Sequence, residues 1–257
     1  MNFITTNYDF VLELLEDITK QDPPLPTDLI VCSSREAFLI EVVSILERHH
    51  GEHTVSTADP AREGVDQTGQ ATSSSRSHVL SSPSLYLLNA SQYCRLVFCP
   101  SITVLRGYLS GYVSTSAMPV QPTSRVGPEG RQLIILNLLR LHHGSSEFTL
   151  QGLSQTLATA VSAAHRTHRC LQLVECKDTT DLFNPNSGPA LWHAQVPLLS
   201  GSIKIGESGA SWGRRTISTS KIASRWFKVQ GSLHMGKAHR PGNIPHNRPN
   251  VEDEMLV

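Results

Sequence analysis

Two short segments of the chain have the residue spacing of known functional motifs, and the first has the spacing of a phosphate loop. Residues 231–237 read GSLHMGK and match the pattern G-x-x-x-x-G-K. In a working loop a serine or threonine follows the lysine to hold magnesium, and a helix begins there and binds phosphate at its N-terminus. Here Ala238 follows the lysine, and Pro241 comes too soon for a helix to continue. We therefore do not expect this segment to bind nucleotide.

The second segment, Gly209 to Gly213, has the G-x-S-x-G spacing of a nucleophile elbow around Ser211. Such an elbow must join a strand to a helix, so that the serine hydroxyl is lifted above the sheet. The residues that follow, RRTISTSKIA, are rich in β-branched side chains and indicate a strand, and no acid lies between Ser211 and His234. These features favour a glycine-rich hairpin turn, and a hydrolase is not expected.

A nucleotide-binding α/β protein keeps its phosphate loop after the first core strand, which we place at Leu29 to Cys32. The segment that follows, Val31 to Ala37, contains neither glycine nor lysine, so its backbone cannot wrap a phosphate and no ammonium compensates the charge. A later apolar strand leads to Asn137, where a metal-binding aspartate is expected, and a neutral asparagine is a weaker ligand for a hard cation. We therefore expect no catalytic residue, no metal and no cofactor, and the sequence favours a protein that is not an enzyme.

The cysteines and the overall composition bound the class of protein. The five cysteines (Cys32, Cys94, Cys99, Cys170 and Cys176) show no C-x-x-C spacing, which favours buried, reduced thiols in a cytosolic or nuclear protein over a zinc site. The 22 basic and 22 acidic residues cancel, which argues against coating nucleic acid by bulk charge. No apolar run is long enough to cross a membrane, and the first nine residues do not resemble a secretion signal.

Helical and strand patterns alternate along most of the chain. We expect helices from Asn7 (as the cap) to Lys20, after Ser33 or Ser34, at 102–113 and at 150–168, and strands at 29–32, 95–99, 132–139 and 170–175, with another short element at Leu85 to Leu88. The last third reads as strands alone, at Gly201 to Ile205 and Thr216 to Val229. This order predicts an α/β fold with a mostly parallel sheet flanked by helices and a C-terminal antiparallel hairpin extension.

Three stretches are too polar or too rich in proline to join this core. Residues 51–78 hold almost no large apolar side chains, residues 114–130 carry three prolines, and the tail 231–257 carries three prolines and no periodic pattern. Such segments bury too little surface to offset the entropy of ordering. We therefore predict a single domain at 1–230, with a disordered insertion at 51–78 and a linker at 114–130, followed by a disordered tail.

The middle of the chain resembles a known family. The segment LIILNLLRLHH, a short loop and then LQGLSQTLATAVSAAHRTHRCLQLVEC are similar to the centre of the RecA-type recombinases. There, a strand ending in a metal-binding acid leads through a loop to a helix start of the type L-S-x-R-Q, a long helix and another strand. The end of the chain is similar too, with a strand, a glycine-rich hairpin containing Arg214 and Arg215, and a closing strand. The resemblance implies a RecA-like domain.

The absent phosphate loop and Asn137 depart from the pattern of the RecA family, so the resemblance implies a domain that does not hydrolyse ATP. The chain looks most like the small, degenerate recombinase paralogues of fungal Shu-type complexes, which act as assembly and DNA-binding partners. This implies a non-catalytic subunit of a recombination and repair complex that pairs with a related paralogue, with the nucleus as its favoured location. Two alternatives stay open: a divergent ATPase of the RecA class, and a structural subunit like the ring-forming subunits of Elongator in transfer-RNA modification.

Charge along the chain adds a separate argument. The stretch from Lys204 to Arg240 holds eight basic residues against one acid, while residues 1–30 carry six acids against one lysine. Cations interleaved with Trp212, Trp226 and Phe227 are suited to phosphates and stacked bases. A solvated face beside half-buried aromatic side chains would give the same pattern. The candidate nucleic-acid-binding residues are Lys204, Arg214, Arg215, Lys221, Arg225 and Lys228.

Overall fold

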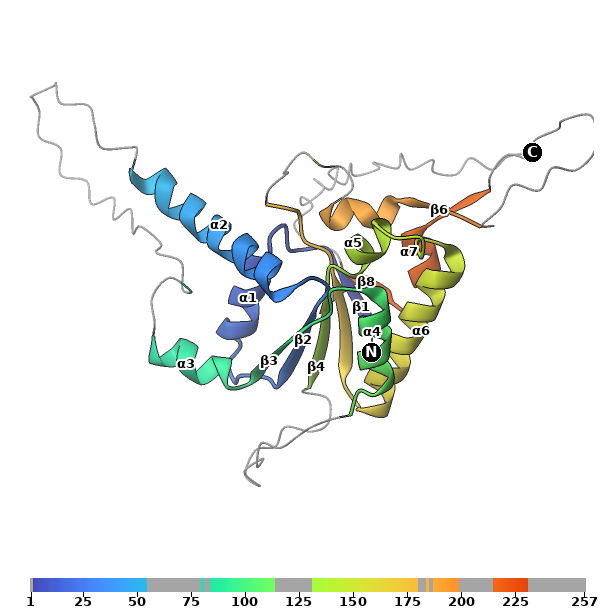
Figure 1. Ribbon diagram of the computed structural model, residues 1–257. Helices are drawn as coiled ribbons and strands as arrows, with labels where there is room; N and C mark the ends of the chain where they lie inside the picture. The colour runs from blue at the N-terminus through green and yellow to red at the C-terminus, as the bar shows by residue number, and fades with distance from the viewer. Residues whose placement is uncertain are drawn as a thin grey trace, which may run out of the picture.

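The computed structural model describes residues 2–54, 80, 84–113, 131–179, 184, 187–198 and 215–230. Six strands form one sheet in the order β3-β2-β4-β5-β1-β8, and every neighbouring pair is parallel (Figure 1). The strands are β1 (Asn2–Thr5), β2 (Thr27–Val31), β3 (Cys94–Phe98), β4 (Gln132–Leu136), β5 (Cys170–Val174) and β8 (Lys228–Gln230). The first and last strands of the described chain therefore pair with each other inside one sheet.

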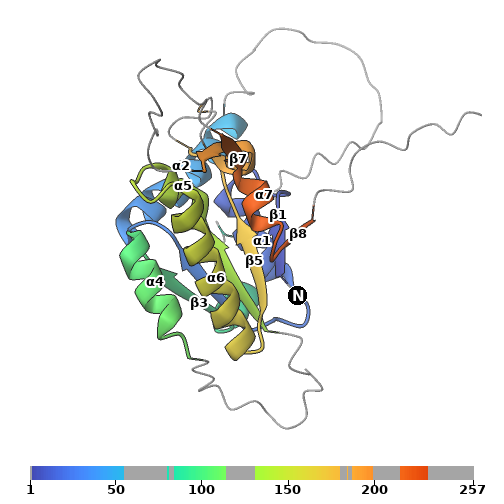
Figure 2. The same ribbon diagram turned by 90° about the vertical axis from the view of Figure 1, so that its right-hand side faces the viewer.

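Helices cover both faces of this sheet. On one face lie α1 (Val11–Lys20), α2 (Arg35–Thr54) and α3 (Leu85–Ser91), and on the other α4 (Ile102–Ser110), α5 (Leu138–His143), α6 (Leu150–Arg166) and α7 (Thr219–Ala223) (Figure 1). Figure 2 faces the second layer and shows α4 and α6 side by side. The central strands β2 and β4 are almost wholly buried, and residues 29–31 and 133–136 within them are all apolar, as expected of parallel strands that are covered on both faces.

Helix boundaries follow local capping chemistry. The Thr149 hydroxyl accepts a hydrogen bond from the backbone N–H of Gly152 at 3.0 Å, which starts α6, and Ser101 caps α4 in the same way. Along α6, Leu153, Leu157 and Ala164 recur at helical spacing and are buried against the sheet. Two apolar cores result, one on each face of the sheet.

A separate, two-stranded antiparallel sheet is formed by β6 (Gln195–Pro197) and β7 (Thr216–Ser218), and a 3-10 helix, η3 (Gly188–His193), precedes it. The predicted α/β fold, a parallel sheet flanked by helices with an antiparallel extension, is confirmed. The predicted single strand Thr216 to Val229 is wrong, because it comprises β7, α7 and β8. Ser218 ends the strand, since its hydroxyl accepts from the Lys221 N–H and caps α7.

The first strand, the start of the first helix and the end of β4 differ from the sequence prediction. Strand β1 was not predicted, and Asn7 is not the cap of the first helix, which begins at Val11. There the Glu13 carboxylate accepts from the backbone N–H groups of Asp9 and Phe10. The predicted strand 132–139 ends at Leu136, because Asn137 takes a left-handed conformation with φ 61° and α5 follows.

Part of the predicted disordered insertion is helical, since residues 51–54 belong to α2. The remainder of that insertion (55–78), the linker 114–130, the tail 231–257 and the predicted strand Gly201 to Ile205 lie outside the described residues. Within the described part of the chain, no helix is both long enough and apolar enough to cross a bilayer.

Candidate nucleic-acid interface and the carboxyl end of the sheet

Strands β2 and β4 are neighbours, and the chain leaves them on opposite faces of the sheet. After β2 it continues through α2 on one face, and after β4 it continues through α5 and α6 on the other. Open α/β sheets bind ligands in the crevice at such a point, outside the carboxyl ends of the strands. The residues there are Cys32 to Ser34 and Asn137, so they are the first to consider as a nucleotide or metal site.

The connection from β2 to α2 is a tight turn followed by a helix cap. Cys32 donates its backbone N–H to the Leu136 carbonyl at 3.0 Å and so extends the ladder between β2 and β4. The Ser34 hydroxyl accepts from the Ala37 N–H at 3.2 Å, and the Ser34 carbonyl accepts from the Phe38 N–H. These groups are therefore engaged in the sheet and in the start of α2, without a loop that encircles an anion.

Asn137 stands immediately after β4 and is almost fully buried. Its amide oxygen accepts from the Cys176 backbone N–H at 2.8 Å, and its own N–H donates to the Val174 carbonyl at 2.8 Å. The side chain at the position where the sequence led us to expect a metal-binding acid thus ties the ends of β4 and β5 together. Its oxygen, the atom that would ligate a cation, already accepts a hydrogen bond from the backbone.

Glu175, the residue after β5, is a buried carboxyl that we did not single out from the sequence. Its oxygens accept from the backbone N–H groups of Leu139 at 2.6 Å and Arg140 at 3.3 Å, at the beginning of α5. Burial raises the pKa of Glu175 to about 8, although these donors and the Arg140 charge oppose the rise. With 1% of its surface exposed, Glu175 cannot reach a substrate, which a catalytic acid must do. An acid directly after a buried strand was the available sequence signal.

Arg140 of α5 joins the ends of two further elements. Its guanidinium lies 2.5 Å from Asp178 after β5 and 3.6 Å from Glu41 of α2. Burial raises the pKa of Glu41, and the Arg140 charge opposes that rise. Asp178 and Glu41, which lie near the carboxyl end of the sheet, are thus paired with Arg140 of the same chain. Among the described residues, no group of three or more His, Cys, Asp or Glu side chains is arranged to hold a metal ion.

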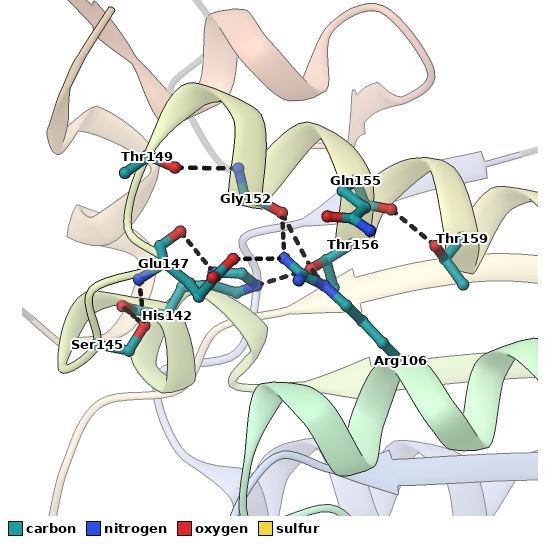
Figure 3. Close-up of polar contacts among 9 residues, drawn as sticks. All are labelled: Arg106, His142, Ser145, Glu147, Thr149, Gly152, Gln155, Thr156 and Thr159. Carbon is teal, nitrogen blue, oxygen red and sulfur yellow. Dashed lines mark hydrogen bonds and ion pairs between the residues drawn. The ribbon is translucent and has the colours of Figure 1, made fainter. Parts of the chain in front are cut away.

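A second polar cluster holds α5 and α6 against α4 (Figure 3). The Arg106 guanidinium of α4 donates to the Thr156 hydroxyl at 2.9 Å and to the Gly152 carbonyl at 2.8 Å, and it pairs with Glu147 at 3.0 Å. The fully buried His142 lies against the same Thr156, at 3.1 Å. The cluster fixes the loop between α5 and α6.

The partners of His142 determine its proton positions. Its Nδ1 lies 3.2 Å from the Glu147 carbonyl, and a carbonyl can only accept, so Nδ1 carries the proton. Nε2 is then an acceptor, and the Thr156 hydroxyl, whose oxygen accepts from Arg106, has one proton to donate either to Nε2 or to the Gly152 carbonyl, each at 3.1 Å. Burial is the main cause that lowers the pKa of His142 to about 4; the hydrogen bond to the Glu147 carbonyl opposes this shift, and the Arg106 charge adds to it. His142 is therefore a neutral structural residue at pH 7.

Four of the six predicted nucleic-acid-binding residues are described, and all four are exposed. Arg215 precedes β7, Lys221 lies on α7, Arg225 follows α7, and Lys228 begins β8. Figure 2 shows β7, α7 and β8 succeeding one another along one side of the molecule. Residues 215–230 contain no acid, so these cations have no acidic neighbour within their own segment. Lys204 and Arg214 lie outside the described residues.

The aromatic residues expected to interleave with these cations behave differently from one another. Phe227 is 4% exposed and belongs to the core, so it cannot stack on a base. Trp226 is half-buried, and the guanidinium carbon of Arg225 lies 5.9 Å from its ring centroid. Trp212 lies outside the described residues. The described surface therefore offers charge and one partly accessible aromatic ring.

Neither protein-family models, nor curated proteins, nor solved structures give a match to this chain. The resemblance to RecA-type recombinases therefore stays a prediction, and the function must be argued from the geometry of the chain itself.

Proposed function

We propose that the protein is a non-catalytic subunit of a DNA recombination and repair complex, similar to degenerate RecA-type paralogues. In this role it assembles with a related paralogue, contacts DNA through its C-terminal cations and works in the nucleus. Its mechanism is binding and scaffolding, in which phosphate contacts supply affinity without reading the base sequence.

The observation that carries this proposal is the closure of the carboxyl end of the sheet by the protein's own contacts. Asn137 is bound to Cys176, and Glu175 is bound to the start of α5. A ligand that used the Asn137 or Glu175 side chain would have to displace these contacts, and leaving the buried Glu175 without its donors costs more than an ordinary hydrogen bond. This supports a binding role over the alternative of a divergent ATPase.

The exposed cations supply the second half of the proposal. Four positive side chains between residues 215 and 230, without an acid among them, create a local positive surface on a chain whose total charge is zero. Each cation that neutralises a phosphate releases counterions, so DNA affinity should fall steeply as salt rises. Because these contacts touch the backbone, different sequences of equal length should bind about equally.

The test is fluorescence anisotropy with labelled single-stranded and duplex DNA of mixed sequence, between 50 and 200 mM salt. Replacing Lys221 and Arg225 by alanine should lower the slope of log K against log salt by about 1.8 on duplex DNA, since each phosphate contact contributes about 0.9. The matched control is Lys20→Ala, an exposed lysine of the acidic helix α1. No binding at low salt, or an equal effect of Lys20→Ala, would contradict the proposal.

A parallel measurement separates the scaffold from the ATPase. Ligands stabilise the folded state that binds them, so ATP with magnesium should leave the melting temperature unchanged if the carboxyl end is closed. A rise that grows with ATP concentration would favour the divergent ATPase instead.

A further inference from the structure

Among the described residues, five of the eleven exposed large apolar side chains lie close together in the sequence, beside one edge of the sheet. Leu85, Tyr86 and Leu88 of α3, Tyr93 after it and Leu96 of β3 are between 38% (Tyr93) and 86% (Leu85) exposed. We call these five residues the α3–β3 surface. Strand β3 is the end strand of the sheet and α3 packs directly beside it (Figure 1).

The five side chains belong to one side of the molecule. Cys94 and Phe98, which alternate with Leu96 along β3, pack into the core beneath α1 and α2, so Leu96 also points to that face. Helix α3 contacts α1 on the same face. Phe98 is covered by Phe38 of α2 at a ring distance of 5.6 Å, whereas Leu96 stays 45% exposed.

The composition of this surface is that of an interface core. From Ser81 to Cys94 the chain carries no acidic or basic residue, although leucine and tyrosine are exposed there. Depletion of charge together with enrichment of tyrosine distinguishes the centre of protein interfaces from ordinary surface. A surface without charge also meets no repulsion when it faces a copy of itself.

The size of the surface fits a dimer of standard dimensions. Scaled by their exposure, the five side chains present roughly 400 Å² of apolar area, counting about 150–250 Å² for a whole aromatic side chain and somewhat less for leucine. A standard interface buries about 800 Å² on each partner, of which about 57% is apolar, or about 450 Å². The apolar area on α3 and β3 is thus what one half of such an interface requires.

We propose that the α3–β3 surface is the contact between two copies of this chain, related by a two-fold axis. In such an interface the same patch faces itself, so the requirement is self-complementarity, which an uncharged apolar surface meets. This contact is distinct from pairing with a paralogue and from DNA binding, and it depends on neither.

The test is sedimentation velocity on the full chain from the lowest detectable concentration up to about 100 μM, because interfaces of this size range from about micromolar to picomolar affinity. The average mass should rise with concentration from 28.2 kDa towards twice that value. Leu88→Glu, at a position 61% exposed, should raise the dissociation constant at least about tenfold, because it places like charges opposite each other in the dimer. Val229→Glu is the matched control, since Val229 is 62% exposed on β8 at the other end of the sheet.

A charge-swap experiment distinguishes a lost interface from a damaged fold. Leu88→Glu and Leu88→Lys should each be monomeric alone, and their mixture should regain the dimer, because opposite charges then meet across the axis. A wild-type chain that stays monomeric at 100 μM would overturn the proposal and indicate that another protein or another segment of this chain covers the surface. Equal weakening by Val229→Glu, or no weakening by Leu88→Glu, would overturn it as well.

Discussion

His142 should make the stability of this protein depend on pH in a way that a single substitution removes. In the folded state its pKa is about 4, against 6.5 for an ordinary histidine. Between these values the unfolded chain binds a proton that the folded chain does not, so the free energy of unfolding falls as the pH falls from 6.5 towards 4. The full loss is about 3.4 kcal/mol, because one pKa unit corresponds to 1.36 kcal/mol.

A second buried group acts in the opposite direction over part of this range. Glu175 has a folded pKa of about 8 against 4.5 for an ordinary glutamate, so the folded chain binds the extra proton between these values and stability falls as the pH rises. Between pH 4.5 and 6.5 the two slopes nearly cancel. The histidine contribution must therefore be read as a difference between variants.

The perturbation is His142→Gln, followed by urea denaturation and tryptophan fluorescence at several pH values. The substitution is expected to destabilise at pH 7.5, because hydrogen bonds to Glu147 and Thr156 are lost. That penalty should shrink by about 2.5 kcal/mol on going to pH 4.5. At this pH the histidine of the unfolded wild-type chain binds a proton, which lowers the free energy of unfolding of the wild type but not of the variant. His193→Gln, at an exposed histidine of η3, should show no such change. A penalty for His142→Gln that is constant with pH would refute the reasoning.

Three further substitutions test other parts of the structure. Glu175→Gln should gain stability relative to wild type as the pH rises from 4.5 to 8, by at most about 5 kcal/mol, in the same urea assay. Gly152→Ala should destabilise by about 1–3 kcal/mol, because its Cβ would lie 2.3 Å from a backbone oxygen, whereas Gly107→Ala in open space should stabilise by about 0.5–1 kcal/mol. Asp28→Asn should cost about 3–5 kcal/mol, since it leaves the buried Arg169 without its carboxylate partner at 3.3 Å, and thermal melting at pH 7 measures it.

The fold class could be predicted from the sequence because the central strands have a clear hydrophobic pattern. The runs around Leu29 and Leu133 are continuously apolar, and α6 keeps an apolar stripe through four turns. Strand β1 was not accessible, since four residues, NFIT, carry too short a pattern, and their place between β5 and β8 depends on residues more than 160 positions away. Such long-range pairing leaves little local signal.

The candidate site was predictable in part. Asn137 was singled out by its position after a buried strand and the C-terminal cations by their clustering, and the DNA contact of these cations stays a prediction. The role of Glu175 was not recognised, because its partners are the backbone N–H groups of a helix that begins at Leu138, within what reads as a strand. The prediction of one strand at 216–229 was wrong because of a local hydrogen bond. Its β-branched residues suit a strand, but the Ser218 hydroxyl accepts from a backbone N–H and starts α7.

The short helix α5 connects these observations. Its first turn donates backbone N–H groups to the Glu175 carboxyl group, its middle holds Arg140 between Asp178 and Glu41, and its last turn buries His142. A helix of six residues is not stable on its own, so these contacts must hold it in place. A change of Asn137 to aspartate alone is not expected to create a metal site, because the side chain at this position accepts from the Cys176 N–H and Glu175 accepts from the first turn of α5. Within the described residues, the polar groups at this end of the sheet therefore serve its stability, which supports the proposal that the protein acts through its outer surfaces.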